Sequence, residues 1–427
     1  MKMRLSGKII VAYVAMVMTF TVLMIGVSCI PRSAVSRNVV SSMKVMEDEG
    51  LYRKIMNFKL FQLDNFTDTY MMNLVVSADS RHPVEAAMMN YNYKSSNFLD
   101  LAYNTEKVAQ GQSFSGGVKN SYARYWHGYQ VVLKPLLVII DYSVIRVVNY
   151  IAMTVLLCGV AVLMWKRIGR KACVLFLVSL LLINFPIVPL SLQFSTCFYI
   201  SFIAMLLVMM GRNILKDGSN LFTLFFCIGG VTAFMDFLTT PQLTLGLPLI
   251  CYMLMSEREG KWKQVIYVSC VWTLGYGLLW ASKWGIGHLL TGNDILAAAK
   301  EAAELRASDI YKGMHMTVPG IVGFIWNAIK AKHLVGVLVA ALLFVFVMTV
   351  VYVKAVDGKK KAKDYAYLLI IMLMVPVWFF VLRNHSIQHG WFTWRAGLLS
   401  LYSLLLFVGY TSSWKNIINK KADDRHE

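Results

Sequence analysis

Ten apolar stretches divide this chain of 427 residues into segments that approach membrane-spanning length. A helix needs roughly 20 consecutive apolar residues to cross the hydrocarbon core of a bilayer, and the first stretch, at residues 9–30, has that length. Hydrophobic residues make up 57% of the chain and charged residues only 15%, which is too few for an ordinary soluble domain. The sequence therefore predicts an all-α polytopic membrane protein, a single integral membrane domain over residues 1–427 with about ten transmembrane helices. The later stretches lie at residues 147–165, 172–189, 196–211, 220–238, 242–255, 265–282, 334–353, 365–382 and 396–414.

Basic residues gather in every second connection between these stretches. They precede the first stretch and recur within residues 166–171, 212–216, 258–263, 354–363 and 415–425, whereas residues 189–195 and 239–241 contain no Lys or Arg. Positive charge stays on the cytoplasmic side of a membrane protein, so both termini are predicted to be cytoplasmic and the chain to lie in the cell membrane. The net charge of +19 is then explained by topology and by contact with anionic lipid, and no nucleic-acid partner is expected.

This topology places residues 31–146 outside as a long first loop and residues 283–333 as a second one. Apolar residues at helical spacing, such as Leu51, Ile55 and Phe58, predict short helices packed on the bundle rather than an independent domain. The acidic run at residues 47–49 is interpreted as a solvated helix face, and Asp141 and Arg146 as ordinary interface charges. The seven cysteines lie in or beside apolar stretches, so no disulfide framework or metal spacing is expected.

The densest acidic cluster in the first loop contains Asp64, Asn65 and Asp68. The two carboxylates are four residues apart, so a helix would place both on one face. Two carboxylates held close together raise each other's pKa, which suits one of them to accept a proton near neutral pH. The same oxygens could hold a divalent cation such as Mg²⁺ or Mn²⁺, and a capped, solvated helix face is the alternative without a function.

A second cluster combines Arg124, Trp126 and His127 among tyrosines. A guanidinium suits phosphate, and an imidazole can add a hydrogen bond. An aromatic belt at the membrane interface with a snorkelling arginine is the other interpretation.

A third cluster occupies the predicted outer turn at residues 383–395 and contains Arg383, His385, His389 and Arg395. Outer turns normally avoid arginine because positive charge there opposes insertion. This concentration of cations predicts an anionic partner.

Two further charged residues are predicted at the outer ends of apolar stretches. Asp236 ends the fifth apolar stretch, and a carboxylate among apolar residues needs a cation such as Arg395, or an acceptor hydroxyl, to offset its cost. Lys283 lies at the outer end of the seventh stretch.

Short segments of this chain resemble those of bacterial C-type (GT-C) membrane glycosyltransferases, which have many spans and a long first outer loop with an acidic residue. The segments are residues 62–68, 122–128, 236–241 and 384–395. The acidic residues here are four apart, whereas in that family they are often adjacent. The chain also contains no Walker phosphate loop, dinucleotide fingerprint, H-E-x-x-H or G-x-S-x-G motif, so an activated substrate must arrive in the membrane.

The resemblance implies an enzyme that moves a sugar from a polyprenyl-phosphate donor to a glycan or lipid-linked acceptor on the outer face. Asp68, or else Asp64, would be the general base. The implied donor-phosphate ligands are Arg383, Arg395, Arg124 and His127, assisted by His385 and His389. The implied residues that orient the acceptor or a cation are Asp236, Asn65, Trp126 and Lys283.

Two other functions fit the same outer cations. A transporter or flippase of a lipid-linked sugar would use them too, but it should also show polar residues along a mid-membrane path. An O-antigen-ligase-like or polymerase-like enzyme would share the donor, but it would have its largest loop late in the chain.

Overall fold

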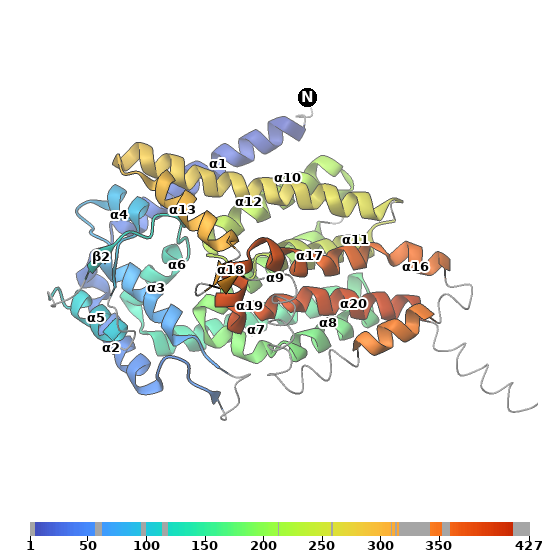
Figure 1. The fold of residues 1–427 in the computed structure, drawn as a ribbon, viewed down its shortest axis with the longest axis horizontal. Coiled ribbons are helices and arrows are strands. Elements are labelled where there is room, and N and C mark those ends of the chain that lie inside the picture. Colours follow the sequence, from blue (N-terminus) through green and yellow to red (C-terminus); the bar gives the residue numbers. More distant parts are fainter. Residues whose placement is uncertain are drawn as a thin grey trace, which may run out of the picture.

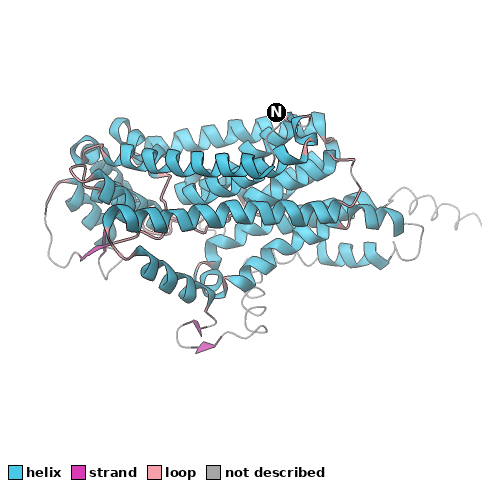
Figure 2. Cartoon of the chain, turned by 90° about the horizontal axis from the view of Figure 1, so that it is seen from above, coloured by secondary structure: helices cyan, strands magenta, loops and turns pink. Residues whose placement is uncertain are grey.

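The protein is an almost entirely helical structure. The structure is a computed structural model, and it describes residues 5–55, 62–94, 100–112, 118–211, 213–257, 259–308, 310–311, 314–315, 342–351 and 359–412. Helices dominate these residues, with only two small two-stranded antiparallel sheets among them (Figure 2). The predicted all-α class is confirmed.

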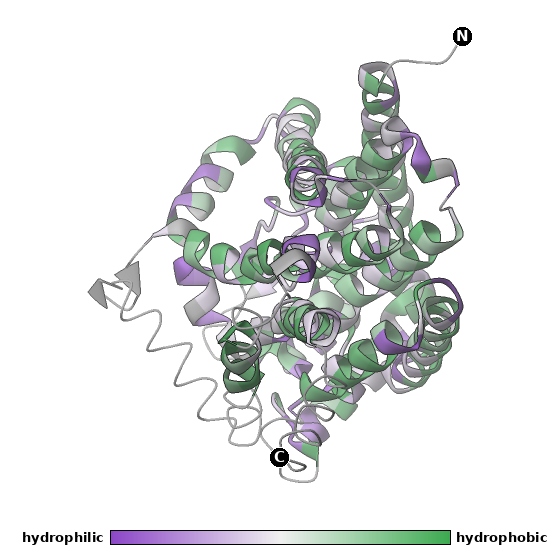
Figure 3. Cartoon of the chain, turned by 90° about the vertical axis from the view of Figure 1, so that its right-hand side faces the viewer, coloured by the Kyte–Doolittle hydropathy of each residue, from purple (hydrophilic) through white to green (hydrophobic). Residues whose placement is uncertain are grey.

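Five helices are long and apolar enough to cross a membrane. Many of their apolar side chains are exposed, including Met18, Val22 and Val155, which are 63%, 66% and 66% exposed. Seen end on, much of the helical ribbon of the bundle consists of hydrophobic residues (Figure 3). A soluble protein would not expose so much apolar surface, so lipid is the natural environment of this bundle. The five helices are α1 (Leu5–Ser28), α7 (Tyr142–Arg167), α9 (Leu192–Met210), α10 (Gly218–Met235) and α12 (Lys261–Thr291).

Shorter elements complete the described bundle, so the predicted count of ten spans is not confirmed. The predicted span at 172–189 is divided, because the chain turns at Asn184 in a left-handed conformation with a φ of 61°. A helix also covers residues 342–351. The other elements are α8 (Arg170–Leu182), η3 (Phe185–Leu190), η4 (Ile214–Lys216), α11 (Gln242–Met255), α16 (Lys359–Tyr365), α17 (Tyr367–Val381), α18 (Arg383–Gln388), α19 (Gly390–Thr393), η5 (Trp394–Ala396) and α20 (Gly397–Thr411).

Short helices and one small sheet form a cap at one end of the bundle (Figure 1). Apolar residues of α2 and α3 share a core that also includes Tyr142 and Ile145 of α7, so the bundle completes the core of the cap. We use "helical cap" for α2 (Arg32–Glu49), α3 (Asn65–Ser77), α4 (Pro83–Met89), β1 (Asn92–Lys94), α5 (Asp100–Ala109), β2 (Val118–Asn120) and α6 (Gln130–Ile139).

Helix α12 is longer than the sequence predicts. The seventh apolar stretch ends at residue 282, but the helix continues to Thr291, where Gly292 closes it with a φ of 69°. The predicted second loop at 283–333 therefore begins inside a helix, and α13 (Ile295–Ala307) and the β3–β4 hairpin (Ile310–Tyr311, Met314–His315) follow. Residues 316–333, with His333, lie outside the described residues.

Helices α10 and α12 pack with their backbones almost in contact, at two glycines. A Cβ atom on Gly229 would lie 2.2 Å from the carbonyl oxygen of Trp272, and one on Gly275 would lie 2.2 Å from that of Phe226. Small residues permit this close approach between membrane helices, where packing replaces the hydrophobic driving force. The backbone carbonyls cannot move aside as a flexible side chain would.

Replacing Gly229 with alanine should therefore push α10 and α12 apart and lower the free energy of unfolding by about 2 kcal/mol, a typical cost of overpacking. The measurement is thermal unfolding in detergent. Gly277→Ala is the matched control on α12, because a Cβ atom there meets nothing within 4 Å. Equal melting temperatures for the Gly229 variant and the unmodified protein would contradict the close packing.

Candidate functional site

Asp68 joins the helical cap to the bundle. Its carboxylate accepts hydrogen bonds from the backbone N–H groups of Leu192 and Gln193, each at 3.0 Å, and from the phenol of Tyr142. These N–H groups belong to the first turn of α9, whose own N-cap residue, Ser191, makes no side-chain cap. Asp68 thus caps α9 from a separate element, where a carboxylate is favoured by the unpaired N–H groups and the helix dipole.

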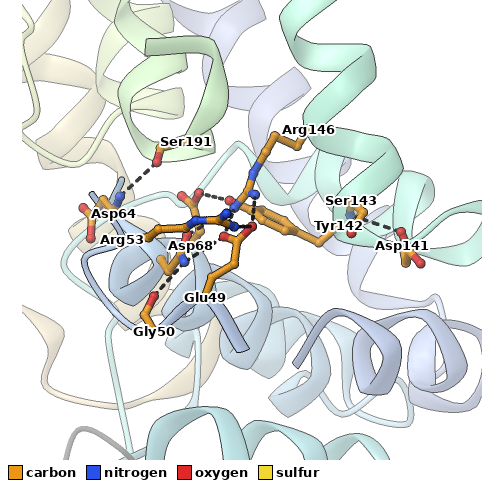
Figure 4. Close-up of polar contacts among 11 residues, drawn as sticks. Glu49, Gly50, Arg53, Asp64, Asp68, Asp141, Tyr142, Ser143, Arg146 and Ser191 are labelled. Carbon is orange, nitrogen blue, oxygen red and sulfur yellow. Dashed lines mark hydrogen bonds and ion pairs between the residues drawn. The ribbon is translucent and has the colours of Figure 1, made fainter. Parts of the chain in front are cut away.

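Asp64 lies at the start of α3 and is fully buried (Figure 4). Its N–H donates to the Ser191 hydroxyl at 3.0 Å, and its Oδ1 accepts from the Thr67 N–H at 3.1 Å. Its Oδ2 has no hydrogen-bond partner among the residues that the structure describes. Burial, and then the negative charge of Asp68, raise the pKa of Asp64 to about 8, against the opposing charge of Arg395. A buried carboxylate oxygen without a donor is costly, which suggests a functional reason for it.

Arg395 comes from η5, more than 300 residues along the chain, and its charge acts on Asp64. The side chain is 3% exposed, and its guanidinium lies 4.2 Å from the ring centroid of Phe194. Its Nε and Nη1 atoms have no hydrogen-bond partner among the described residues. Burial lowers the pKa of Arg395 to about 10, and Asp64 opposes that shift. The guanidinium is therefore still charged at neutral pH, with donors left for an anionic acceptor.

Two other buried side chains beside this pair also have an unpaired polar atom. Gln193 Oε1 and Thr393 Oγ1 have no hydrogen-bond partner among the described residues. Gln193 is the second residue of α9, next to Phe194, and Thr393 is two residues before Arg395. Together the unpaired polar atoms of these four buried residues could offer a ligand both donors and acceptors. We call Asp64, Gln193, Thr393 and Arg395 the carboxylate–guanidinium site.

A hydrogen-bonded ion pair fixes the residues around this site. Arg146 of α7 donates to both carboxylate oxygens of Glu49, at 2.8 and 3.0 Å, and to Asn65 Oδ1 at 3.2 Å (Figure 4). Asn65 donates to Glu49 at 3.0 Å and to the Gly50 carbonyl at 2.7 Å. Although burial opposes it, the hydrogen bonds and charge of Arg146 lower the pKa of Glu49. The network locks the end of α2 and the start of α3 onto α7.

This network corrects two predictions. Glu49 was expected on a solvated face and Arg146 as an ordinary interface charge, yet their side chains are only 11% and 13% exposed. Asn65, expected to orient an acceptor, is engaged with Glu49 and Gly50. Glu49 and Arg146 are not recognisable as partners from the sequence because they are 97 residues apart, and the role of Asn65 toward an acceptor stays a prediction.

Residues 122–128 hold the cap on α10 and α12. Trp126 donates to the Leu279 carbonyl at 2.7 Å, and the Gly128 N–H donates to the Phe234 carbonyl at 2.8 Å. Lys283 is fully buried, and its ammonium donates to the carbonyls of Ala87 and Met88 at the end of α4, at 3.0 and 2.7 Å. Trp126 and Lys283, both predicted to orient an acceptor, therefore make structural contacts.

Arg124 and His127 lie within a group of aromatic rings. The Arg124 guanidinium is 4.3 Å from the centroid of Tyr122 and 5.4 Å from that of Tyr125. His127 adopts a left-handed φ of 56°, and its Nε2 is 3.1 Å from the Tyr122 carbonyl oxygen. Burial lowers the pKa of His127 to about 3, so the imidazole is neutral at physiological pH and brings no charge to a phosphate. No described contact joins this group to Asp64 or Arg395.

The predicted turn at 383–395 is helical and joins two parts of the bundle. His385 Nε2 is 2.8 Å from the Leu238 carbonyl oxygen, and the His385 and His389 rings are 4.7 Å apart. His389 contacts Phe392, which contacts Phe194 below the Arg395 guanidinium. Arg383 donates to the carbonyl of Phe380. Of the two arginines in the turn, the described interactions connect only Arg395 with a carboxylate of the first loop.

Asp236 shapes the neighbouring loop. Its carboxylate accepts from the N–H groups of Leu238 and Thr239 and from the Thr239 hydroxyl, and it is 1% exposed. Burial raises the pKa of Asp236. These three donor groups of the neighbouring turn offset the cost of its burial, and no described contact joins it to Arg395. The resulting turn presents the Leu238 carbonyl to His385.

No family model matches this chain, and neither does any curated protein or any solved structure. Among the described residues, no three His, Cys, Asp or Glu side chains gather to hold a metal ion, and the divalent cation stays a prediction. The function must be argued from the geometry of the site.

Removing one partner of the Glu49–Arg146 pair should lower the free energy of unfolding by about 3 kcal/mol, because the other charge remains buried. A double-mutant cycle with Glu49→Gln and Arg146→Gln should give a coupling of about 2 kcal/mol. Arg53→Gln is the control: Arg53 also contacts Glu49 at 2.8 Å but is 52% exposed, so its loss should cost less than about 1 kcal/mol. Equal effects of the Arg53 and Arg146 variants would contradict the proposal that the buried Glu49–Arg146 pair holds α2 and α3 against α7.

Thermal stability should fall as the pH rises from about 4 to about 8. The folded pKa of Asp64 is raised to about 8, so the folded state holds a proton that the unfolded state releases near pH 4. Its contribution is complete below pH 4 and is lost as pH rises through 8. The melting temperature of Asp64→Asn should depend less on pH, whereas the exposed control Asp48→Asn should follow the unmodified protein.

Proposed function

We propose that this chain is a membrane glycosyltransferase that moves a sugar from a polyprenyl-phosphate donor to a glycan or lipid-linked acceptor. The observation that carries the proposal is that a buried carboxylate, Asp64, and a buried guanidinium, Arg395, lie near enough for their charges to interact. Both side chains are buried, and the charge of each shifts the pKa of the other. Both also have polar atoms without a hydrogen-bond partner among the described residues. A general base beside a phosphate-binding cation is the combination that this transfer requires.

In the proposed reaction, Asp64 Oδ2 takes the proton of the acceptor hydroxyl, and that oxygen attacks the anomeric carbon of the donor sugar. The bond from the anomeric carbon to the phosphate oxygen breaks, and the lipid phosphate leaves with the electron pair. The Arg395 guanidinium stabilises the charge that develops on the phosphate. A pKa of about 8 makes Asp64 a stronger base than an ordinary carboxylate while leaving part of it ionised at neutral pH.

The carboxylate of Asp68 supports this assignment of the base to Asp64. Its oxygens already accept three hydrogen bonds, two of them from α9. Donors that favour the ionised form reduce its tendency to take a proton, and burial with these bonds leaves its pKa at about 6. We assign Asp68 to positioning the start of α3, where Asp64 lies.

A cavity near the start of α3 could hold the acceptor, although neither Asp64 nor Arg395 is among the residues that line it. A cavity of about 320 Å³ lies between α2, α3 and α5, lined in part by Gly50, Asn65 and Thr69. Asn65 is the neighbour of Asp64 in the chain. A cavity of this size is in the range that holds small ligands.

The distribution of charge supports a site on the outer face. At the end of the bundle away from the helical cap, Lys8 at the start of α1 donates to Ser219 and Asn220 at the start of α10, each at 2.7 Å. The Lys171 ammonium there donates to the Gly409 carbonyl near the end of α20. With that basic end in the cytoplasm, the cap and the carboxylate–guanidinium site are outside.

The test is transfer of a radiolabelled sugar from a polyprenyl-phosphate donor in membranes that contain the full chain. Asp64→Asn should lower the rate about 10²- to 10⁴-fold, the usual contribution of a general base. Arg395→Gln should lower it by a similar factor, the usual cost of removing an electrostatic stabiliser. Asp68→Asn should reduce both rate and melting temperature, because it uncaps α9.

Asp48→Asn is the matched control, since Asp48 is an exposed carboxylate of the same cap. Full activity of folded Asp64→Asn protein would remove the proposed base. Movement of an intact lipid-linked sugar across the membrane without transfer would assign the site to a flippase instead.

A further inference from the structure

A second polar cavity lies at the far end of α3 from Asp64. Its volume is about 410 Å³, and it is formed where α2 begins, α3 ends and the β1–β2 sheet approaches them. Asp64 and Ser77 are separated by the whole length of α3, about 20 Å for 13 residues. The cavity is thus distinct from the carboxylate–guanidinium site. Its lining residues are Arg32, Ser77, Ala78, Asp79, Ser80, Arg81, Tyr93 and Lys119.

The lining carries more positive than negative charge. Asp79 is its acidic side chain, and Arg81 is already bonded to it, at 3.1 Å from Nε to Oδ1 and 3.2 Å from Nη2 to Oδ2. Arg32 and Lys119 therefore remain without a carboxylate in the lining. Arg32 donates through Nε to the Val76 carbonyl at 2.8 Å, which fixes its guanidinium at the cavity wall.

A buried cation whose charge interacts with that of Arg32 adds to this imbalance. Lys134 of α6 is 0% exposed, and its ammonium has no hydrogen-bond partner among the described residues. The charge of Arg32 acts on it, and burial together with that charge lowers the pKa of Lys134 to about 8. The positive charge of Lys134 therefore adds to that of Arg32 in attracting an anion, although Lys134 itself does not line the cavity.

The position of the cavity relative to the membrane limits which classes of ligand can reach it. Arg32 comes four residues after Ser28, the end of the apolar helix α1. Helix α6 contacts α1, and its apolar Val132 and Ile139 are 54% and 77% exposed. Exposed apolar residues beside the end of a spanning helix indicate a place at the membrane surface, where lipid headgroups lie.

We propose that this cavity binds a phosphate-bearing group at the membrane surface. The Arg32 guanidinium and the Lys119 ammonium contact the phosphate oxygens, and the hydroxyl group of Ser80 is a neighbouring donor. The source of the phosphate is either the headgroup of an anionic lipid or a phosphorylated soluble molecule. The inference does not depend on sugar transfer, because it rests on charges and a cavity that Asp64 and Arg395 do not share.

The full chain in nanodiscs provides the test, with two probes. The first is glycerol 3-phosphate added to protein in phosphatidylcholine nanodiscs, with binding measured by calorimetry. The second is phosphatidylglycerol mixed into the nanodisc, with retained lipid counted by native mass spectrometry. Binding of the soluble probe assigns the site to a free phosphate, and retention of the lipid alone assigns it to a headgroup. Either result supports the phosphate site.

Arg32→Gln combined with Lys119→Gln should weaken binding of the effective probe at least about tenfold, equivalent to about 1.4 kcal/mol. Arg37→Gln is the matched control, because Arg37 is an exposed cation on the same helix and does not line the cavity. Absence of binding to the unmodified protein, or equal binding by the double variant and the control, would overturn the proposal. Asp64→Asn should bind the probe normally, so failure here and failure of the proposed transferase are distinguishable.

Discussion

The hydrogen bonds from the start of α9 to Asp68 are the interaction on which the site depends. The cap and the bundle are distant in sequence, and a single carboxylate satisfies N–H groups that α9 cannot pair by itself. Ser191, released from capping its own helix, accepts instead from the backbone of Asp64. The start of α3 is thus fixed against α9 by two sets of contacts, those of Asp68 with the α9 N–H groups and that of Asp64 with Ser191. With α3 held there, the Asp64 carboxylate has no freedom to turn toward water.

Burial gives the two charged residues of the site their unusual character. In water, Asp64 and Arg395 would form an ordinary ion pair of small net value. In the protein, each has lost its hydration while keeping polar atoms without partners among the described residues. The effect on their pKa values has the same cause in both cases, since burial disfavours whichever form is charged. Burying these unpaired polar atoms lowers the stability of the fold. A bound phosphate and acceptor hydroxyl would offset that loss by forming hydrogen bonds with them.

Much of the fold could be predicted from the sequence, because apolar length determines where a chain can cross a bilayer. The stretches at 9–30 and 220–238 correspond to α1 and α10 within a few residues. Contacts between distant residues could not be predicted. Arg146 is 97 residues from Glu49 and resembles any interface charge until the two are brought together. Ser191 carried a weak signal as a capping residue before an apolar stretch, whereas nothing in the sequence indicated that Asp68 would cap the same helix.

The length of α12 has a consequence for how the protein responds to its membrane. Its 31 residues extend about 46 Å, whereas the hydrocarbon core is about 30 Å thick. The surplus turns stand beyond the lipid and bring the Lys283 ammonium to the end of α4. A rigid rod of this kind changes its tilt when bilayer thickness changes. A change in bilayer thickness that tilted α12 would therefore also move the contacts of Lys283 with α4 at the base of the cap.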